Sequence, residues 1–388
     1  MKKKVAFILG KMTQGGPAVS LLNLLQLIDY SKYDVTIILF NPGGIFFNEI
    51  PTNIKLKYVK PRGLFCSIND DKLSYLLWFP VRGALKVIGE ILIRLFKQKR
   101  QIKWKLKKVF LQKDYTCYDI GMTFSIEGSI YYLSEFVNAK IKIGTIATDY
   151  ISAKLNKDFD YHYFNKLNYL ACVSEENGNI LKHVFPEFIE KVIVIPTFIS
   201  PKDILERSER VKGFKDDFDG PRILTLARYC TTKGIDLAID ACSILVKNGF
   251  KIRWYVLGNG DSLYFNKLMV NHNIQYNFFL LNPTNNPYPY IKECDIYVQP
   301  SRYEGKSVAI MEAKALNKPI VITNFSTSVD NIIHMKEGLV AEMNSKALAD
   351  SIQMLIESPS LRKQFSNYLK GNFKGNEKDV HRIFDLIK

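Results

Sequence analysis

Short runs of apolar residues alternate with helix-length segments along the whole chain. In the first half these runs are rich in Val, Ile and Leu and occur at residues 5–9, 34–40, 54–59, 120–123, 141–146, 171–174 and 192–195. Uninterrupted apolar runs of this length, separated by helices such as the one predicted at 18–28, indicate parallel strands that are covered on both faces. The first half is therefore predicted to be a doubly wound α/β domain.

The same pattern starts again in the second half. Strands are predicted at 222–227, 254–257, 278–281, 295–298 and 319–323, and a helix at 235–247. A chain of 388 residues is also longer than one ordinary core supports. We therefore predict two Rossmann-like domains facing across a cleft. Their boundaries are an N-terminal domain at 1–200, a charged linker at 201–221, a C-terminal domain at 222–375, and a final amphipathic helix at 376–388 that packs back on the first domain.

Composition narrows the class of protein. The 54 basic and 38 acidic residues give a net charge of +16, which favours an anionic partner. The cysteines and the five histidines are scattered without a C-x-x-C pair, so neither a disulfide framework nor a zinc site is expected. No apolar run reaches the length of a bilayer crossing, and the one near the start is too short for a signal peptide. We expect a cytoplasmic protein without a bound metal or cofactor.

One segment is strongly basic. Between residues 82 and 113, eleven Lys and Arg residues face only Glu90 and alternate with apolar residues that include Phe96, Trp104 and Phe110. A basic amphipathic helix with aromatic residues suits the surface of an anionic bilayer. The alternative is a surface helix whose apolar side packs on its own domain. Nucleic acid is not an expected partner, because no DNA- or RNA-binding signature accompanies the charge.

Two cations follow the first strand of the second half. Arg228 comes directly after the predicted strand 222–227, and Lys233 lies five residues later, where a helix begins. Cations at a strand end and at a helix N-terminus converge on an anion, and two of them suit a diphosphate. The alternative is a pair of exposed loop charges.

Two carboxylates follow a later strand. Glu304 is predicted to lie on the loop after strand 295–298, and Glu312 on the following helix, roughly 12 Å further along its axis. That separation suits two contacts to one extended ligand better than a close acid/base pair. The backbone N–H groups of residues 305–308 at the helix start form an anion cradle.

These motifs together resemble a known family. The segments R-x4-K-G-I-D from Arg228, V-L-G-N-G-D at 256–261 and P-S-R-Y-E-G-K-S-V-A-I-M-E from Pro300 resemble the second domain of GT-B retaining glycosyltransferases of family 4. The likeness covers about residues 222–345 and is greatest to bacterial enzymes that build capsule, exopolysaccharide or O-antigen.

The resemblance implies a role for each residue of the motifs. Arg228 and Lys233 would neutralise the diphosphate of a nucleotide sugar, Glu312 would hold the ribose, and Glu304 would be catalytic together with the two cations. The donor sugar and phosphate would also contact Gly305, Lys306, Ser307 and Val308, and the base would lie near Leu281 and Asn282. No D-x-D motif stands where a metal-bridged diphosphate would need it, so metal-independent chemistry is expected.

The first half resembles the family more loosely. Gly15 and Gly16 fit its glycine loop beside the transferred sugar, although a glycine pair is also an ordinary turn. Glu127 and Asp149 lie in segments that resemble the acceptor side, although Asp149 also suits a helix cap. In relatives the second segment reads I-H-x-D, and here the histidine position is Ala147.

The predicted function is transfer of a hexose or N-acetylhexosamine, with retention, from a nucleotide diphosphate sugar, and UDP is the expected nucleotide. The acceptor would be a lipid-linked glycan of surface polysaccharide synthesis, presented at the inner face of the cell membrane, to which the protein binds peripherally. Ala147 leaves open a catalytically weak or inactive nucleotide-sugar-binding partner of another transferase. A related GT-B protein with epimerase or phosphorylase chemistry is a third alternative.

Overall fold

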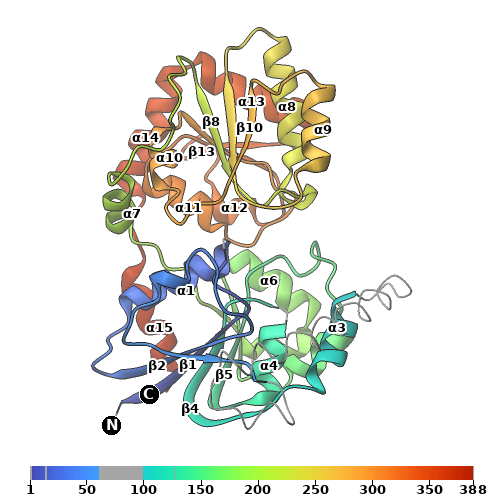
Figure 1. The fold of residues 1–388 in the computed structure, drawn as a ribbon, viewed down its shortest axis with the longest axis vertical. Helices are drawn as coiled ribbons and strands as arrows, with labels where there is room; N and C mark the ends of the chain where they lie inside the picture. The colour runs from blue at the N-terminus through green and yellow to red at the C-terminus, as the bar shows by residue number, and fades with distance from the viewer. Residues whose placement is uncertain (1, 14, 61–98, 127, 388) are drawn as a thin grey trace.

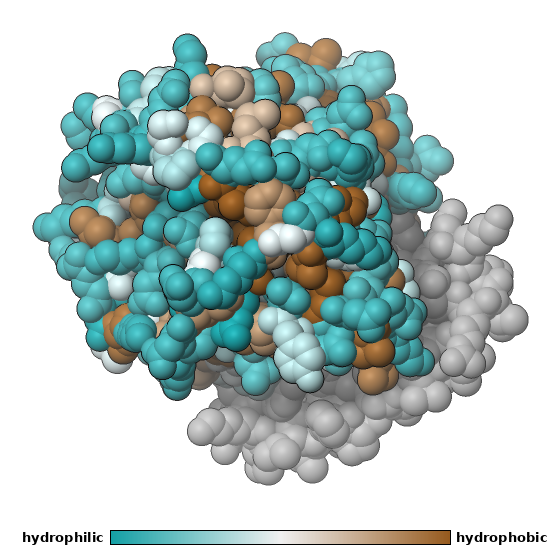
Figure 2. Space-filling model, turned by 90° about the horizontal axis from the view of Figure 1, so that it is seen from above, coloured by the Kyte–Doolittle hydropathy of each residue, from teal (hydrophilic) through white to brown (hydrophobic). Residues whose placement is uncertain are grey.

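The protein consists of two α/β domains stacked one above the other in Figure 1. The computed structural model describes residues 2–13, 15–60, 99–126 and 128–387. The N-terminal domain lies below in this view and carries both chain ends, and the C-terminal domain lies above it. The upper face of the C-terminal domain is mostly hydrophilic, with hydrophobic side chains in small groups (Figure 2).

The N-terminal domain is built on a parallel sheet whose described strands follow the order β3-β2-β1-β4-β5-β6-β7. These strands are β1 Lys3–Leu9, β2 Tyr33–Leu39, β3 Lys55–Tyr58, β4 Asp114–Thr123, β5 Val137–Ile146, β6 Tyr169–Cys172 and β7 Val192–Val194. The helical segments are α1 Gly16–Leu27, η1 Phe47–Glu49, α3 Lys99–Lys108, α4 Gly128–Phe136, α5 Lys157–Phe164, α6 Glu175–Val184 and η3 Pro186–Lys191. The central strands are apolar where both of their faces are covered: on β1, Phe7 is buried on one side and Ile8 on the other.

The C-terminal domain repeats this plan with the strand order β10-β9-β8-β11-β12-β13. Its strands are β8 Arg222–Leu226, β9 Arg253–Leu257, β10 Phe278–Leu281, β11 Ile296–Gln299, β12 Ile320–Thr323 and β13 Gly338–Ala341. Its helical segments are α7 Pro201–Ser208, η4 Thr231–Lys233, α8 Ile235–Lys247, α9 Leu263–Asn271, α10 Tyr288–Glu293, α11 Val308–Ala315, α12 Ser328–Asn331, α13 Ser345–Glu357 and α14 Pro359–Asn372. Trp254 is buried on one face of the sheet and Tyr255 on the other.

The order of the strands places the loops that carry the sequence motifs. Chain order reverses between β1 and β4 in the first sheet and between β8 and β11 in the second. Loops that leave two such neighbouring strands diverge and open a crevice at the carboxyl ends. The Gly15–Gly16 turn follows β1, Lys233 follows β8 and Glu304 follows β11. The carboxyl ends of both sheets therefore point toward the place where the two domains meet (Figure 1).

The chain first crosses between the domains at residues 198 and 199. Phe198 is buried in the N-terminal core and Ile199 in the C-terminal core. Residues 201–221, predicted as a linker, instead begin with α7 and pack on the C-terminal domain, where the Glu293 carboxylate accepts hydrogen bonds from the backbone of residues 213 and 214. That prediction was wrong because the charged composition hides an amphipathic helix whose Ile204 is buried.

The chain crosses back beside this point. The Asn376 side chain accepts a hydrogen bond from the Ile199 amide at 2.8 Å and donates one to the Thr197 carbonyl at 3.0 Å. The following segment was predicted as one helix, but it forms three short turns, η5 Glu377–Val380, α15 His381–Phe384 and η6 Asp385–Ile387. Tertiary packing sets this shape, because the ring of Phe384 stacks on that of Tyr33 in the N-terminal domain, with 4.0 Å between the ring centroids.

Two strand predictions also needed correction. β13 was not predicted, because its four residues GLVA are too few for a periodic signal. β4 and β5 begin several residues before the predicted apolar runs, and their early residues alternate between exposed and more buried positions, as expected where one face meets solvent.

Only part of the basic segment lies among the described residues, from residue 99 onward. Trp104 on α3 is 3% exposed and packs against Tyr131, Phe136 and Tyr163. This finding corrects the expectation that Trp104 faces a bilayer, because its ring is already buried on its own domain. Residues 82–98 of the predicted helix lie outside the described residues. None of the described helices combines the length and apolarity that a membrane crossing requires.

Candidate functional site

A cavity of about 630 Å³ lies between the two domains at the carboxyl ends of both sheets. Its N-terminal wall includes Gly15, Gly16 and Ala147, and its C-terminal wall includes charged side chains. The charged residues of the C-terminal wall are Arg207, Arg228, Lys233, Glu304, Lys306 and Glu312. On the N-terminal wall, Lys11 is the one charged residue among the parts of the chain that are described.

Lys233 and Glu304 meet at the centre of the C-terminal wall. The Lys233 ammonium lies 2.6 Å from the nearer carboxylate oxygen of Glu304. The same oxygen accepts hydrogen bonds from the Ser301 hydroxyl at 2.8 Å and from the Gln299 amide at 3.4 Å. Three donors therefore fix this carboxylate, and the carboxylate fixes the lysine at the cavity.

The loop that carries Lys233 is held by the loop that carries Glu304. Arg302 makes a two-pronged ion pair with Asp236 at the start of α8, with N–O distances of 2.6 and 2.8 Å. The turn itself needs glycine, because Gly234 has a φ of +67° and a Cβ there would collide with the Pro300 carbonyl. The two loops that follow β8 and β11 therefore behave as one unit.

Two further cations line the same wall of the cavity. Arg228 is exposed in the cavity, and none of the residues that the structure describes forms an ion pair with it. Lys306 lines the same wall. Because the basic side chains of this wall outnumber the acidic ones, the wall attracts an anion.

The start of α11 differs from the predicted anion cradle. The backbone amide of Ser307 donates to the Asn331 side chain at 2.8 Å, so it is already in use. Gly305 does not line the cavity, and its carbonyl accepts hydrogen bonds from Thr327 and Asn331. Ser307 and Val308 do line it. The expectation that the amide of Ser307 binds an anion is therefore corrected.

The second predicted carboxylate lies deeper in the wall. Glu312 on α11 is 4% exposed, and one of its oxygens accepts a hydrogen bond from the Tyr288 hydroxyl at 3.2 Å. Burial raises the pKa of Glu312 to about 7, although the Tyr288 hydrogen bond and the charge of Arg207 act in the opposite direction. This carboxyl group therefore changes charge near neutral pH.

Several predicted site residues lie elsewhere. Leu281 and Asn282 do not line the cavity, and the residues on that side are instead Thr284, Asn285 and Pro287. Glu127 lies outside the described residues.

Asp149 also lies outside the cavity lining, and its carboxylate is fully engaged. It accepts hydrogen bonds from the amides of Ile151 and Ser152 and from the hydroxyls of Ser152 and Ser326. Although burial raises its pKa, these hydrogen bonds lower the pKa of Asp149 overall. Asp149 caps a turn and links the two domains, which corrects the prediction that it binds substrate.

The domains touch where small residues face each other. A Cβ on Gly305 would lie 2.5 Å from the carbonyl oxygen of Ala147, and one on Gly16 would lie 3.4 Å from the Val308 side chain. The two walls of the cavity are therefore held together by contacts that leave no room for an added methyl group at Gly305.

Arg207, Tyr288 and Asn285 border the cavity but were not predicted from the sequence. Arg207 belongs to α7, inside the supposed linker. The sequence does carry a signal for this helix, because Ser200 followed by Pro201 and Asp203 is a helix start, and the Ser200 hydroxyl accepts from the Asp203 amide. Tyr288 reaches the site only through the packing of α10 on α11.

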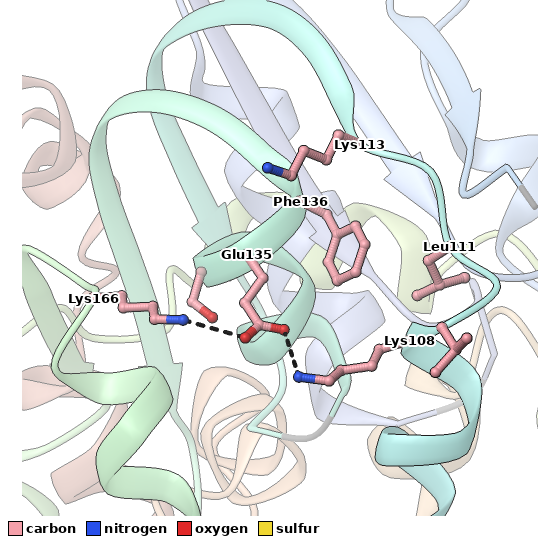
Figure 3. Close-up of a pocket in the computed structure, with 8 residues that line it drawn as sticks. Lys108, Leu111, Lys113, Glu135, Phe136 and Lys166 are labelled. Carbon is pink, nitrogen blue, oxygen red and sulfur yellow. Dashed lines mark hydrogen bonds and ion pairs between the residues drawn. The ribbon is translucent and has the colours of Figure 1, made fainter. Parts of the chain in front are cut away.

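A second cavity, of about 500 Å³, lies away from the cleft at the ends of α3 and α4. Figure 3 shows Lys108 and Lys166 reaching the carboxylate of Glu135, with Lys113 beyond Phe136. The two lysine–carboxylate distances are 3.4 and 3.2 Å. Because Glu135 already pairs with two of the lysines, this cavity is less attractive to an anion than the cleft. Within the described part of the chain, no group of His, Cys, Asp or Glu side chains is suited to hold a metal ion.

Comparison with known proteins agrees with this geometry. Residues 207–371 match the family model "Glycosyl transferases group 1". Over 54% of this chain, the sequence is 24% identical to the poly(ribitol-phosphate) alpha-N-acetylglucosaminyltransferase of Staphylococcus aureus, covering 41% of that protein. Over 49% of the chain it is 26% identical to the N,N'-diacetylbacillosaminyl-diphospho-undecaprenol alpha-1,3-N-acetylgalactosaminyltransferase of Campylobacter jejuni, covering 46% of it. The matches thus span less than half the length of either relative.

Solved structures match the whole chain. A TarM variant from S. aureus in complex with UDP, fondaparinux and alpha-GlcNAc-glycerol superposes with a TM-score of 0.70, at 15% identity and 99% coverage of both chains. Anabaena HepE in complex with UDP-glucose gives a TM-score of 0.70, at 14% identity, covering 99% of this chain and 98% of that one. The prediction of two Rossmann-like domains facing across a cleft, the GT-B fold, is confirmed.

Proposed function

We propose that this chain is a glycosyltransferase that binds a nucleotide diphosphate sugar between its two domains and transfers the sugar to a glycan acceptor. The observation that carries the proposal is the Lys233–Glu304 ion pair at the cavity, in the part of the chain that matches the glycosyl transferases group 1 model. Breaking a bond between a sugar and a diphosphate leaves negative charge on the diphosphate. Cations that are already in place stabilise that charge in the transition state.

Each charged group of the C-terminal wall has a role in this proposal. Lys233 and Arg228 neutralise the departing diphosphate, and Glu304 holds Lys233 in position. Glu312 accepts hydrogen bonds from the ribose hydroxyls of the nucleotide. In this proposal the two cations neutralise the charge that a metal ion neutralises in other transferases. We therefore propose that activity persists when a metal chelator is present.

UDP is the proposed nucleotide, and transfer proceeds with retention of the anomeric configuration. UDP is supported by the solved structures with the same fold, which hold UDP or UDP-glucose. The anomeric configuration of the product, read by proton NMR immediately after transfer, tests retention directly. An inverted product would contradict this part of the proposal.

A lipid-linked saccharide at an anionic membrane surface is the proposed acceptor. It is supported by the C. jejuni relative, whose name specifies an undecaprenol-linked acceptor, and by the net charge of +16. Vesicles that contain phosphatidylglycerol should sediment the protein at low salt, whereas pure phosphatidylcholine vesicles should leave it in solution. Equal binding to both vesicle types would contradict the electrostatic part of this proposal.

The central test uses radiolabelled UDP-glucose and UDP-N-acetylglucosamine with a lipid-linked acceptor. Lys233→Ala and Glu304→Ala should each lower the rate of donor consumption by about a hundredfold or more. Lys251→Ala, at an exposed lysine remote from the cavity, is the matched control and should keep the wild-type rate. Full activity in both cavity variants would refute the assignment of the site, and nucleotide binding without any turnover would favour a non-catalytic partner, as Ala147 allows.

A further inference from the structure

Three side chains from three different helices form a row along one side of the cleft. The guanidinium of Arg207 on α7 lies over the ring of Tyr288 on α10, 4.9 Å from the ring centroid. The hydroxyl of Tyr288 donates to the Glu312 carboxylate on α11 at 3.2 Å. Arg207 is fixed in this place because it also donates to the carbonyl of Asn285 at 2.8 Å.

The row ends on the carboxyl group of Glu312, which is buried, so that its charged form is poorly solvated. Glu312 is 4% exposed, and burial alone favours its neutral form. A ribose offers hydroxyl hydrogens, so a charged carboxylate accepts them better than a protonated acid does. The site therefore needs a group that favours the charged form.

We propose that Arg207 is a positioning residue of the nucleotide site, which keeps the buried Glu312 carboxylate charged and oriented toward the ribose through the intervening Tyr288. The inference rests on the proposed function, and it deepens that function by adding a residue from the segment between the two sheets. Arg207 acts through its positive charge and through its packing on Tyr288, which holds the hydroxyl against Glu312.

Other charged and titratable groups surround this row. Glu49 on η1, in the N-terminal domain, lies 3.4 Å from the Arg207 guanidinium, and Asp203 on α7 lies 4.0 Å from it. Burial raises the pKa of Tyr297 on β11, and the charge of Glu312 acts in the same direction. The negative charge of Glu49 partly neutralises that of Arg207. Glu49 therefore opposes the effect of Arg207 on the Glu312 carboxyl group.

The test is the affinity for UDP-glucose between about pH 5.5 and 8.5, a range in which its two phosphates do not change charge. In the wild type the affinity should rise with pH around a midpoint near 7, as Glu312 ionises. Arg207→Gln should move the midpoint up by about one unit, which lowers the affinity about fivefold at pH 7 and less at pH 8.5. Arg207→Lys should restore most of the shift, because it keeps the charge.

Glu49→Gln is the matched control, since it removes the competing carboxylate and should move the midpoint down. The carboxyl carbon resonance of Glu312, followed by NMR in the ligand-free protein, should show the same shifts in the same directions. A uniform loss of affinity at every pH in Arg207→Gln, with an unchanged midpoint, would overturn this inference and leave the proposed function standing. Failure of the wild type to bind UDP-glucose or UDP-N-acetylglucosamine at any pH would overturn the proposed function, and this inference with it.

Discussion

The C-terminal wall of the cleft presents charged side chains that hold one another in place, whereas the N-terminal wall, apart from Lys11, presents mainly backbone, hydroxyl groups and apolar side chains. On the first wall, Glu304 is fixed by Lys233, Ser301 and Gln299. On the second wall, Gly15, Gly16 and Ala147 offer no charge. Under the proposed function, this difference means that the C-terminal wall would bind the anionic diphosphate of the donor, while the N-terminal wall would set the shape of the space for sugar and acceptor.

The largest effect is expected where the two walls touch. Gly305→Ala places a methyl group 2.5 Å from the Ala147 carbonyl, so the domains must move apart. Because a misplacement of about 1 Å can lower a rate about a hundredfold, we expect a loss of that size in turnover while the protein stays folded. Steady-state kinetics and circular dichroism measure the two properties.

Gly371→Ala is the control for this prediction. Gly371 lies on α14 with nothing near the position of an added Cβ, so alanine should stabilise the helix by about 0.5–1 kcal/mol and leave turnover unchanged. A Gly305→Ala enzyme with the wild-type rate would show that close contact between the walls is not required.

The second prediction concerns the free energy of unfolding, which the burial of the Glu312 carboxylate on the C-terminal wall lowers. The pKa of Glu312 is raised from 4.5 to about 7, so the folded state binds this proton more tightly than the unfolded state. Its contribution to stability is present below pH 4.5 and is lost as the pH rises through about 7. That shift corresponds to about 3 kcal/mol, and the buried amide of a glutamine offsets part of it.

Glu312→Gln should therefore raise the free energy of unfolding at pH 8 by about 2 kcal/mol while weakening nucleotide binding. Urea denaturation of the ligand-free protein at pH 5 and pH 8 measures this difference. Equal stability of the variant and the wild type at both pH values would mean that Glu312 is not destabilised by burial.

The smallest effect is expected on the N-terminal wall. Lys11 is exposed, so its charge is screened by solvent, and it lies on the wall opposite the Lys233–Glu304 pair. Lys11→Ala should change the rate of donor hydrolysis by less than about threefold. If Lys11→Ala lowered this rate as much as Lys233→Ala does, the proposed difference in role between the two walls would be contradicted.

The sequence predicted the charged wall better than the neutral one for a physical reason. Lys233 and Glu304 follow β8 and β11, which are neighbours at the reversal of strand order, so both residues border the crevice that opens there. Arg207 and Tyr288 could not be placed in this way, because they reach the cleft through the packing of α7 and α10. The amide of Ser307 was assigned to an anion because its partner, Asn331, is 24 residues away.

The fold itself was predictable because both faces of each sheet are covered. Long runs of Val, Ile and Leu then mark most of the described strands, whereas the short β13 and the amphipathic α7 were not predicted. The neutral wall carries little that sequence can identify, since glycines, hydroxyl groups and an alanine occur in every protein. Asp149 shows how far such a prediction reaches. Its loop carboxylate was predicted to bind substrate, but it caps a turn and accepts a hydrogen bond from Ser326 across the interface.

Calorimetric titration of UDP and UMP into the wild type and Lys233→Ala tests the central claim most directly, because the two ligands differ by one phosphate. If the charged wall binds the diphosphate, the wild type should bind UDP at least about tenfold more tightly than UMP, and Lys233→Ala should lose most of that preference. A wild type that does not distinguish the two nucleotides, or a variant that keeps the full preference, would contradict the account.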